Sequence, residues 1–358
     1  MIKVGISHGD INGIGYEIIL KTLSDVRILE FCTPVIYGSA KVAAYHKKAL
    51  EILNLSLNIV NGAQSAAGNK INIINCVNEE VKVELSKSTQ EAGEAAFMAL
   101  KRAAADLRDG LIDVLVTAPI NKHNIQNENF KFPGHTEYLQ EIAGAGKNAL
   151  MILATENLRV ALATGHIPLS EVSKLLTVDR ILSKLKDFKE SLNADFGITG
   201  PRIAVLSLNP HGGEEGLLGK EEQEIIIPAM QEAEKQGVLC FGPYPADGFF
   251  GSGAFEKFDG ILAMYHDQGL TPFKTLAMEA GVNVTAGLPV IRTSPDHGTA
   301  YDIAGKNVAS EESFRNSLYM AVDIFHNRKQ HRENIKNPLK KQYFERGSDN
   351  EKLDLSSE

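Results

Sequence analysis

Three histidines in this sequence each follow a short apolar run that is typical of a buried β-strand. His166 comes after RVALAT and a glycine, His211 after RIAVLS and LNP, and His266 directly after GILAMY. Ligands of open α/β sheets bind beyond the carboxyl ends of the strands, so these imidazoles are expected to converge on one point. Three neutral imidazoles hold a divalent cation and leave a position open for a substrate oxygen. The pattern therefore predicts a catalytic metal site.

The identity of that metal is left open by the histidines. Zinc suits three imidazoles best, and cobalt, manganese or magnesium are the alternatives. Asp267 directly follows His266, where its carboxylate is placed to orient the imidazole ring. The competing interpretation is that each histidine is a turn residue that hydrogen-bonds to the backbone. His8 also follows a strand-like run and is not expected to bind metal.

A second set of polar residues is suited to an anion. Lys274, Asn283 and Arg292 lie in a glycine-rich stretch between residues 266 and 305. Lysine offers a mobile charge and arginine a planar fork that matches phosphate or carboxylate oxygens. A surface lysine and a structural ion pair are the alternative interpretation. The stretch therefore predicts a binding pocket for a small anionic molecule.

A helix start at Pro133–Gly134 is a further candidate for anion binding. Thr136 is predicted as the N-cap of the helix, and His135 is placed to donate to the same anion. Free backbone N–H groups at a helix start attract anions. A simple helix cap with no ligand is the alternative.

The glycine-rich opening does not match the dinucleotide-binding fingerprint. Glycines at positions 9, 13 and 15 follow a strand-like run, but GxGxxG would require a glycine where Ile18 stands. The sequence also has no GxxxxGK[ST], GxSxG or HExxH string. A nicotinamide cofactor, if one is used, is therefore not held by a Rossmann fingerprint.

The elements that must position these residues alternate along the chain. Short strands rich in Val, Ile and Leu are separated by helical patterns, which indicates an α/β sheet with helices on its faces. No Gly/Ser/Pro linker marks a boundary, so we expect one catalytic unit over residues 1–327 with two lobes that are discontinuous in sequence. Residues 328–358 form a polar tail that is expected to stay outside the fold. The predicted strands are 3–7, 34–38, 114–117, 159–164, 202–207 and 260–265, and the predicted helices are 15–24, 40–53, 90–109, 136–143, 170–176, 177–193, 220–236 and 311–327.

The composition excludes several classes of protein. The 358 residues carry a formal net charge of −8, which argues against nucleic acid as a partner. Three widely spaced cysteines suggest neither a disulfide framework nor a thiolate zinc site. We find no signal peptide and no apolar run that would span a membrane. A cytoplasmic location is expected.

Several long strings in this chain resemble one family, the 4-hydroxythreonine-4-phosphate dehydrogenases of vitamin B6 (pyridoxal 5′-phosphate) biosynthesis. The resemblance covers about residues 1–327. It is carried by PGHTEYL from Pro133, ATENLRVALATGHIPL from Ala154, LNPHGGEEG from Leu208, AMYHDQGLTPFK from Ala263, and GVNVTAGLPVIRTSPDHGTAYDIAG from Gly281.

The resemblance implies a fold, an assembly and a set of site residues. The fold would be α/β and two-lobed with a central cleft, like the isocitrate and isopropylmalate dehydrogenases, and would not contain a Rossmann domain. The protein would be a homodimer with sites shared between subunits. The resemblance implies His166, His211 and His266 as metal ligands, His135, Thr136, Lys274, Asn283 and Arg292 as substrate-binding residues, and Asp247 and Asp267 as catalytic acidic residues.

The implied reaction is oxidation of 4-phosphooxy-L-threonine at C3 by NAD or NADP, with one divalent metal per site. Loss of carbon dioxide would follow, giving 3-amino-2-oxopropyl phosphate. The choice between NAD and NADP and the identity of the general base stay open. The opening SHGDINGIGYE departs from the family's TxGDPAGIGPE, because Ile11 and Asn12 replace Pro-Ala and Tyr16 replaces a proline.

Three alternatives to this function remain at this stage. The first is a paralogous dehydrogenase that acts on 4-phosphothreonate or 4-phosphoerythronate, whose phosphate, hydroxyl and carboxylate would fit the same pocket. The second is acyl transfer to phosphate, which needs no three-histidine metal site. The third is a binding protein for a metal or a metabolite that carries out no reaction. Bound metal together with NAD(P)-dependent turnover would separate the first from the other two.

Overall fold

The computed structural model describes residues 1–52, 54–78, 80–277 and 279–336. Within them, twelve strands form one sheet. The strand order across the sheet is β3 (Leu57–Val60), β4 (Ile71–Asn75), β2 (Cys32–Gly38), β1 (Ile2–Ser7), β5 (Val114–Thr117), β12 (Arg292–Pro295), β11 (Val282–Ala286), β6 (Leu150–Ala154), β7 (Arg159–Leu162), β10 (Gly260–Ala263), β8 (Arg202–Leu206) and β9 (Leu239–Tyr244).

The sheet has two parallel halves that run in opposite directions. Strands β3, β4, β2, β1, β5 and β12 are parallel to one another, and so are β7, β10, β8 and β9. Three antiparallel pairings join the halves, namely β12 with β11, β11 with β6, and β6 with β7. The chain enters the first half, crosses to the second, and returns for β12. The halves are therefore discontinuous in sequence.

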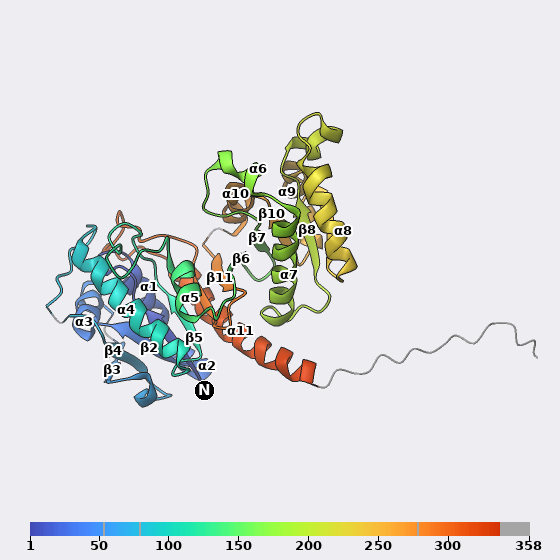
Figure 1. The fold of residues 1–358 in the computed structure, drawn as a ribbon. Helices are drawn as coiled ribbons and strands as arrows, with labels where there is room; N and C mark the ends of the chain where they lie inside the picture. Colours follow the sequence, from blue (N-terminus) through green and yellow to red (C-terminus); the bar gives the residue numbers. More distant parts are fainter. Residues whose placement is uncertain (53, 79, 278, 337–358) are drawn as a thin grey trace, which may run out of the picture.

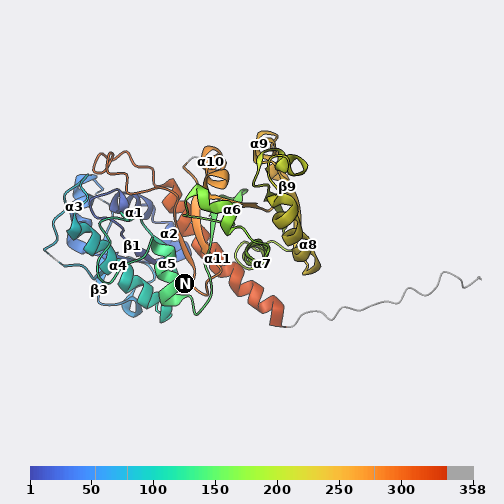
Figure 2. The same ribbon diagram turned by 45° about the horizontal axis from the view of Figure 1, so that its top comes forward.

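Helices cover the sheet, and Figure 1 shows the elements in two groups, α1–α5 on the left and α7–α9 on the right. Both views place α11 at the junction of the two groups (Figures 1 and 2), where it packs on β12, β5 and β11. The helices are α1 (Gly15–Leu23), α2 (Ile28–Phe31), α3 (Ala40–Ala49), α4 (Gln90–Arg108), α5 (His135–Ala143), α6 (Val172–Leu175), α7 (Val178–Ala194), α8 (Ile227–Lys235), α9 (Ala246–Gly251), α10 (His266–Ala277) and α11 (Glu312–Lys336), with 3₁₀ turns at Ala63–Ser65, Leu169–Glu171, η3 (Pro210–Gly216) and Ala254–Lys257 and a π-helical turn, η4, at Glu222–Ile226.

The longer helices start where the sequence offers a side-chain cap. The Oγ1 of Thr89 accepts a hydrogen bond from the N–H of Ala92 at the start of α4, and Thr177 does the same for Arg180 in α7. Buried residues of α4 recur every three or four positions, from Ala92 to Leu107, and pack this helix against β1, β2 and β5. None of the helices in the described ranges is long and apolar enough to span a membrane.

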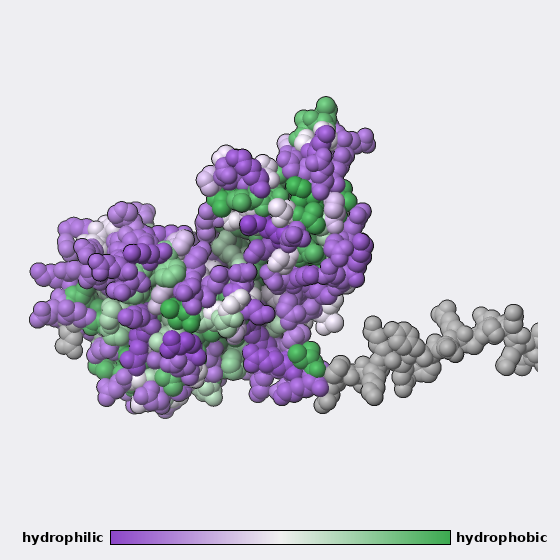
Figure 3. Space-filling view, in the orientation of Figure 1, coloured by the Kyte–Doolittle hydropathy of each residue, from purple (hydrophilic) through white to green (hydrophobic). Residues whose placement is uncertain are grey.

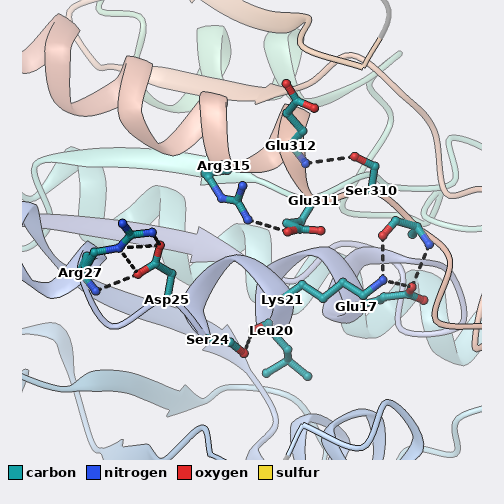
Figure 4. A network of polar contacts seen from close by, with 11 residues as sticks. Glu17, Leu20, Lys21, Ser24, Asp25, Arg27, Ser310, Glu311, Glu312 and Arg315 are labelled. Atoms are coloured by element: carbon teal, nitrogen blue, oxygen red, sulfur yellow. Dashed lines mark hydrogen bonds and ion pairs between the residues drawn. The ribbon is translucent and has the colours of Figure 1, made fainter.

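Polar contacts tie α1 to the segment that leads into α11 (Figure 4). The Nζ of Lys21 donates to Glu17 Oε1 and to the carbonyl of Ala309, both at 2.8 Å. The N–H of Ala309 donates to the same Glu17 oxygen at 2.9 Å. Because the Glu17 side chain is only 2% exposed, this carboxylate depends on these two donors.

The opening turn departs from the family string, and the structure shows what the replacing residues do. The Oδ1 of Asn12 accepts from the N–H of Glu84 at 2.7 Å, and its Nδ2 donates to the carbonyl of Lys87 at 2.9 Å. The Tyr16 hydroxyl accepts from the N–H of Ser39 at 3.1 Å, just before α3. These hydrogen bonds fix the turn through Asn12, where the family string has alanine, and through Tyr16, where it has proline.

The C-terminal boundary of the fold was predicted too early. The polar tail was expected from residue 328, but α11 continues to Lys336. Arg328 explains this extension, because its guanidinium pairs with the buried carboxylate of Asp195 and donates to the carbonyl of Leu288 at 3.0 Å. Residues 337–358 of the predicted tail lie outside the described residues.

Candidate active site

A cavity of about 640 Å³ lies at the junction of the two halves of the sheet. Its walls come from the segments that follow β5, β7, β10 and β12, from the start of α5, and from β6 and β11. Of the residues predicted for metal or substrate, those that line it are His135, Thr136, His166, His266, Lys274, Asn283 and Arg292.

Arg292 is a buried cation whose partners are neutral. Its Nε and Nη2 donate to the Oγ1 of Thr117 at 3.0 and 2.6 Å, and its Nη1 donates to the Oγ1 of Thr285 at 3.2 Å. Burial lowers the pKa of Arg292 to about 9, so the guanidinium remains charged near neutral pH. Hydroxyl groups do not neutralise it, and the carboxylate that acts on it, that of Glu137, makes no hydrogen bond to it in the described structure, so its positive charge can attract an anion in the cavity.

The start of α5 faces the same cavity. Gly134, with an extended backbone, is the N-cap, so the helix begins at His135, and the prediction of Thr136 as N-cap was wrong. Thr136 instead lies in the first turn, with its Oγ1 3.4 Å from that of Thr285. Backbone N–H groups of this turn therefore face the cavity without a side-chain cap.

Three polar atoms lining the cavity are buried and unpartnered within the described part of the chain. They are the Nε2 of His135, the Oδ1 of Asn283 and the Nε2 of His297. Burial, together with the positive charges of Arg292 and Lys122, holds the pKa of His135 well below 6.5. His135 is therefore neutral, with a ring nitrogen available to a ligand.

His166 and His266 come together as predicted. Their ring centroids lie 5.4 Å apart with an interplanar angle of 47°. Two imidazoles that bind one tetrahedral zinc ion at about 2.0–2.1 Å would place their ring centres about 5 Å apart. The Nδ1 of His266 donates to Asp267 Oδ1 at 2.7 Å, which fixes the ring and leaves Nε2 for a ligand. The pKa of His166 is lowered mainly by burial and also by the positive charge of the nearby Lys122. This shift favours the neutral imidazole, which is the form that binds metal.

The third histidine does not line the cavity. Strands β7, β10 and β8 are adjacent and parallel, as the histidine pattern required. After β8, however, the chain turns into η3, where His211 is exposed. No group of three or more His, Cys, Asp or Glu within the described ranges is arranged to hold a metal. One copy of the chain thus supplies two of the three expected ligands at the cavity.

The two acidic residues predicted as catalytic are placed differently. Asp247 lies exposed in the first turn of α9 and does not line the cavity. Asp267 has an 80% exposed side chain and contacts His266. The geometry therefore connects Asp267 to the site through His266 and leaves Asp247 outside the cavity.

Lys274 and its neighbours form the wall after β12. The Nζ of Lys274 donates to the carbonyl of Asp296 at 3.0 Å and lies 3.2 Å from its Oδ1. Burial raises the pKa of Asp296, although Lys274 opposes this shift. Burial lowers the pKa of the adjacent His297, whose Nε2 is buried without a partner in the described structure. These titratable groups are candidates for proton transfer.

Several residues of the cavity were missed by the sequence analysis. Lys122, Arg180 and Lys184 line it and carry positive charge, as do Lys274 and Arg292. The carboxylates of the lining are those of Glu137 and Asp296. The cavity is therefore cationic inside a chain whose net charge is −8. Such lysines and arginines look like surface residues of helices and loops until the fold turns them inward.

Comparisons with known proteins agree with this architecture. The family described as "Pyridoxal phosphate biosynthetic protein PdxA" matches residues 30–321. A 4-hydroxythreonine-4-phosphate dehydrogenase from Bacteroides thetaiotaomicron is 61% identical over 99% of this chain and 98% of its own. A protein from Oceanobacillus iheyensis, provisionally named D-threonate 4-phosphate dehydrogenase, is 37% identical over 90% of this chain and 97% of its own. The crystal structure of a 4-hydroxythreonine-4-phosphate dehydrogenase from Klebsiella pneumoniae is 37% identical, with a TM-score of 0.78 over 91% of this chain and 98% of its own.

Proposed function

Since the chain belongs to the PdxA family of pyridoxal phosphate biosynthetic proteins, we propose that it is a 4-hydroxythreonine-4-phosphate dehydrogenase. Its substrate would be 4-phosphooxy-L-threonine, oxidised at C3 with NAD or NADP and then decarboxylated to 3-amino-2-oxopropyl phosphate. The observation that carries the proposal is the buried, un-neutralised guanidinium of Arg292 in the same cavity as the His166–His266 pair. An anion site beside a metal-binding pair is what a phosphorylated hydroxy acid requires.

Different residues of the cavity would bind different groups of the substrate. Arg292, His135 and the N–H groups at the start of α5 would bind the phosphate, with Thr136 beside them. Asn283 offers an unpartnered buried carbonyl oxygen to a substrate donor. When bound, a divalent cation at His166 and His266 would supply Lewis acidity at the C3 hydroxyl, and NAD(P)⁺ would accept the hydride. Fixing the phosphate orients C3 toward the histidine pair.

We propose that the functional unit is a homodimer in which His211 of the partner subunit completes the metal site. Two observations support this. His211 is exposed and absent from its own cavity, and the residues that follow its turn, Leu217 and Leu218, are 79% and 44% exposed. Figure 3 shows apolar residues gathered at the top of the right-hand group, on an otherwise largely hydrophilic face. Exposed apolar side chains beside a ligand are typical of an interface. Zinc is the proposed metal, with cobalt, manganese or magnesium as alternatives.

The shared site can be tested by mixing two inactive variants. His166→Ala and His211→Ala each remove one ligand, so each homodimer should be inactive. A heterodimer of the two would carry one intact site and one site lacking both ligands. Random mixing should therefore restore about a quarter of wild-type activity. If all three ligands came from one copy, the mixture would stay inactive.

The fold proposed for this enzyme is the two-lobed arrangement of the isocitrate and isopropylmalate dehydrogenases, without a Rossmann domain. Support comes from the two halves of the sheet, which run in opposite directions with the cavity at their junction. The opening glycine-rich turn lacks the third glycine of the dinucleotide fingerprint. A cytoplasmic location is proposed, since Cys32, Cys76 and Cys240 are free thiols.

One assay tests the activity and its main alternative together. Purified protein with added metal is given NAD⁺ or NADP⁺ and 4-phosphooxy-L-threonine, and NADH or NADPH formation is followed by absorbance. Parallel reactions contain 4-phospho-D-threonate and 4-phosphoerythronate, because of the Oceanobacillus relative. Metal-dependent turnover of the amino acid, lost in Arg292→Met, would support the proposal. Turnover of the sugar acids alone would assign the chain to the paralogous reaction.

A further inference from the structure

The turn that carries His211 has an uncommon backbone. Residues 211–215 all have positive φ, at 53, 67, 79, 43 and 56°. Gly212 and Gly213 adopt this left-handed conformation readily, while His211, Glu214 and Glu215 adopt it against the steric preference of a residue with a Cβ. Strain of this kind persists only where the surroundings hold the backbone in place, and it is concentrated at functional sites.

Glu222 is the residue that holds this turn. Its Oε1 accepts from the N–H groups of Leu208 and Asn209, both at 2.8 Å, and its Oε2 accepts from Asn209 Nδ2 at 3.0 Å. The carboxylate also touches the turn itself, because a Cβ on Gly213 would lie 2.7 Å from Glu222 Oε2. Glu222 thus accepts hydrogen bonds from the residues before His211 and lies close to Gly213, two residues after it.

The local structure explains why this carboxylate is available inside the protein. Glu222 begins the π-helical turn η4 that precedes α8, and it is 2% exposed. All three of its donors are neutral amides. A buried carboxylate costs free energy unless several donors satisfy it, and here three donors do so. Because two of those donors are backbone N–H groups just before His211, the carboxylate fixes the chain where the strained turn begins.

We infer that Glu222 is a positioning residue, which locks the left-handed turn so that the His211 imidazole is presented to a divalent cation in one orientation. The inference rests on the proposed function, in which His211 is a metal ligand. The coupling runs through Asn209. Its backbone N–H donates to Glu222 Oε1, and its Nδ2 is shared between Glu222 Oε2 at 3.0 Å and Glu221 Oε2 at 2.7 Å. The N–H of Gly212 donates to the Asn209 carbonyl at 3.2 Å. His211 lies between these two fixed points.

Titration of the full-length protein with cobalt, followed by calorimetry and by the visible absorbance of the bound ion, measures the affinity of the metal site that includes His211. Glu222→Ala should weaken cobalt binding about 10–100-fold, as is usual when the support of a metal ligand is removed. Glu222→Gln keeps Oε1 as an acceptor for both N–H groups but turns an amide toward Asn209 Nδ2, so it should bind with intermediate affinity. The matched control is Glu224→Gln, an exposed glutamate of the same η4 turn, which should bind cobalt like wild type.

Two further readouts separate positioning from general stability. In the metal-free protein, Glu222→Gln should speed hydrogen exchange at the amides of Leu208 and Asn209 while the thermal midpoint stays close to wild type. If Glu222 were merely structural, the thermal midpoint would fall and cobalt affinity per folded molecule would not change. That result would overturn the inference.

His211→Ala provides the reference that keeps the two proposals apart. If His211→Ala binds cobalt as tightly as wild type, the proposed metal site is wrong and the role of Glu222 fails with it. If His211→Ala binds weakly while Glu222→Gln and Glu222→Ala both match wild type, the metal site stands and the inference about Glu222 is overturned. Weak binding by His211→Ala and both Glu222 variants supports the inference.

Discussion

The guanidinium of Arg292 donates two hydrogen bonds to a single atom, the Oγ1 of Thr117, although the two residues are 175 positions apart. Thr117 ends β5 and Arg292 begins β12, and these strands are neighbours in the sheet. The hydroxyl orients the fork without cancelling its charge. Thr117, which carries no charge of its own, therefore fixes the orientation of the guanidinium in the proposed anion site.

Removing that hydroxyl should weaken anion binding. In Thr117→Val the Arg292 side chain loses two of its three hydrogen bonds, and one bond to a charged group is worth about 1.5–3 kcal/mol. We expect substrate affinity, measured by calorimetry, to fall about 10–100-fold. Thr117→Ser keeps the acceptor and should stay near wild type. Equal losses in both variants would mean that the methyl group, not the hydroxyl, is what matters.

Anion binding should also draw a proton onto His135. Burial, Arg292 and Lys122 hold the pKa of His135 well below 6.5 in the empty cavity. A bound anion offsets those positive charges, so the pKa should rise and protons should be taken up as the anion binds. Sulfate is the suitable probe because its own charge does not change in this range. Calorimetry at about pH 6 in buffers of different ionisation enthalpy measures the uptake.

His135→Gln is the control for this proton uptake, because it keeps a donor but cannot titrate. It should bind sulfate with no proton uptake. Uptake of the same size in this variant would assign the proton to another group, such as His297.

Two buried histidines should make the fold sensitive to acid. His8 and His46 stack on opposite faces of Tyr16, with ring centroids 5.1 Å away in each case. Burial is the main cause that lowers the pKa of each to about 4 from 6.5. Between these values the unfolded chain binds protons that the folded protein does not, so stability falls as the pH drops from 6.5 to 4.

Denaturant unfolding at a series of pH values checks this. Each histidine should cost on the order of 3 kcal/mol across the full window. His46→Gln, which can still donate to the Ile11 carbonyl, should reduce the slope by about one proton. A slope identical to that of wild type would show that His46 protonates within the folded protein.

The Glu17–Lys21 pair should matter more than its exposed counterparts. In Lys21→Met the carboxylate of Glu17, 2% exposed, would retain only the N–H of Ala309. Removing one partner of a buried pair costs about 3 kcal/mol, measured as the free energy of unfolding. Lys87→Met, which breaks an exposed pair with Glu84, should cause no measurable change. Adding Glu17→Gln to Lys21→Met should restore part of the loss, because the unpaired charge is then gone.

The sequence predicted well those parts of the fold that depend on local patterns. The β7, β8 and β10 strands stand out as continuous apolar runs, and the helices predicted over 90–109 and 177–193 match α4 and α7 to within one residue at each end. Six strands were missed, and some of them carry weak signals. RTSP has no apolar side chain apart from its proline, and LCFGPY contains glycine and proline, so pairing with neighbours makes them strands. LMILA of β6 is a continuous apolar run that the sequence analysis passed over.

A residue of the candidate site could be predicted only where the sequence immediately around it indicated a role. Arg292 and His135 lie in strings whose residue types suit an anion, and the fold brings them together. Lys122, Arg180 and Lys184 have no such signal, because their inward orientation depends on how two distant halves meet. The position of His211 was also beyond prediction, since five consecutive left-handed residues redirect the chain after β8.

The position of β12 has a consequence for the order in which the protein can be made. This strand lies between β5 and β11 in the middle of the sheet, yet of the strands in the described residues it is the last to leave the ribosome. The N-terminal half must therefore wait, with one side of β5 unpaired, until about four-fifths of the chain has been synthesised. Because Arg292 is the first residue of β12, the anion site is the last part of the sheet to form. In a truncated or stalled chain the sheet would be incomplete and the proposed ligand could not bind. Such a chain would be a substrate for chaperones and proteases and would have no enzymatic activity.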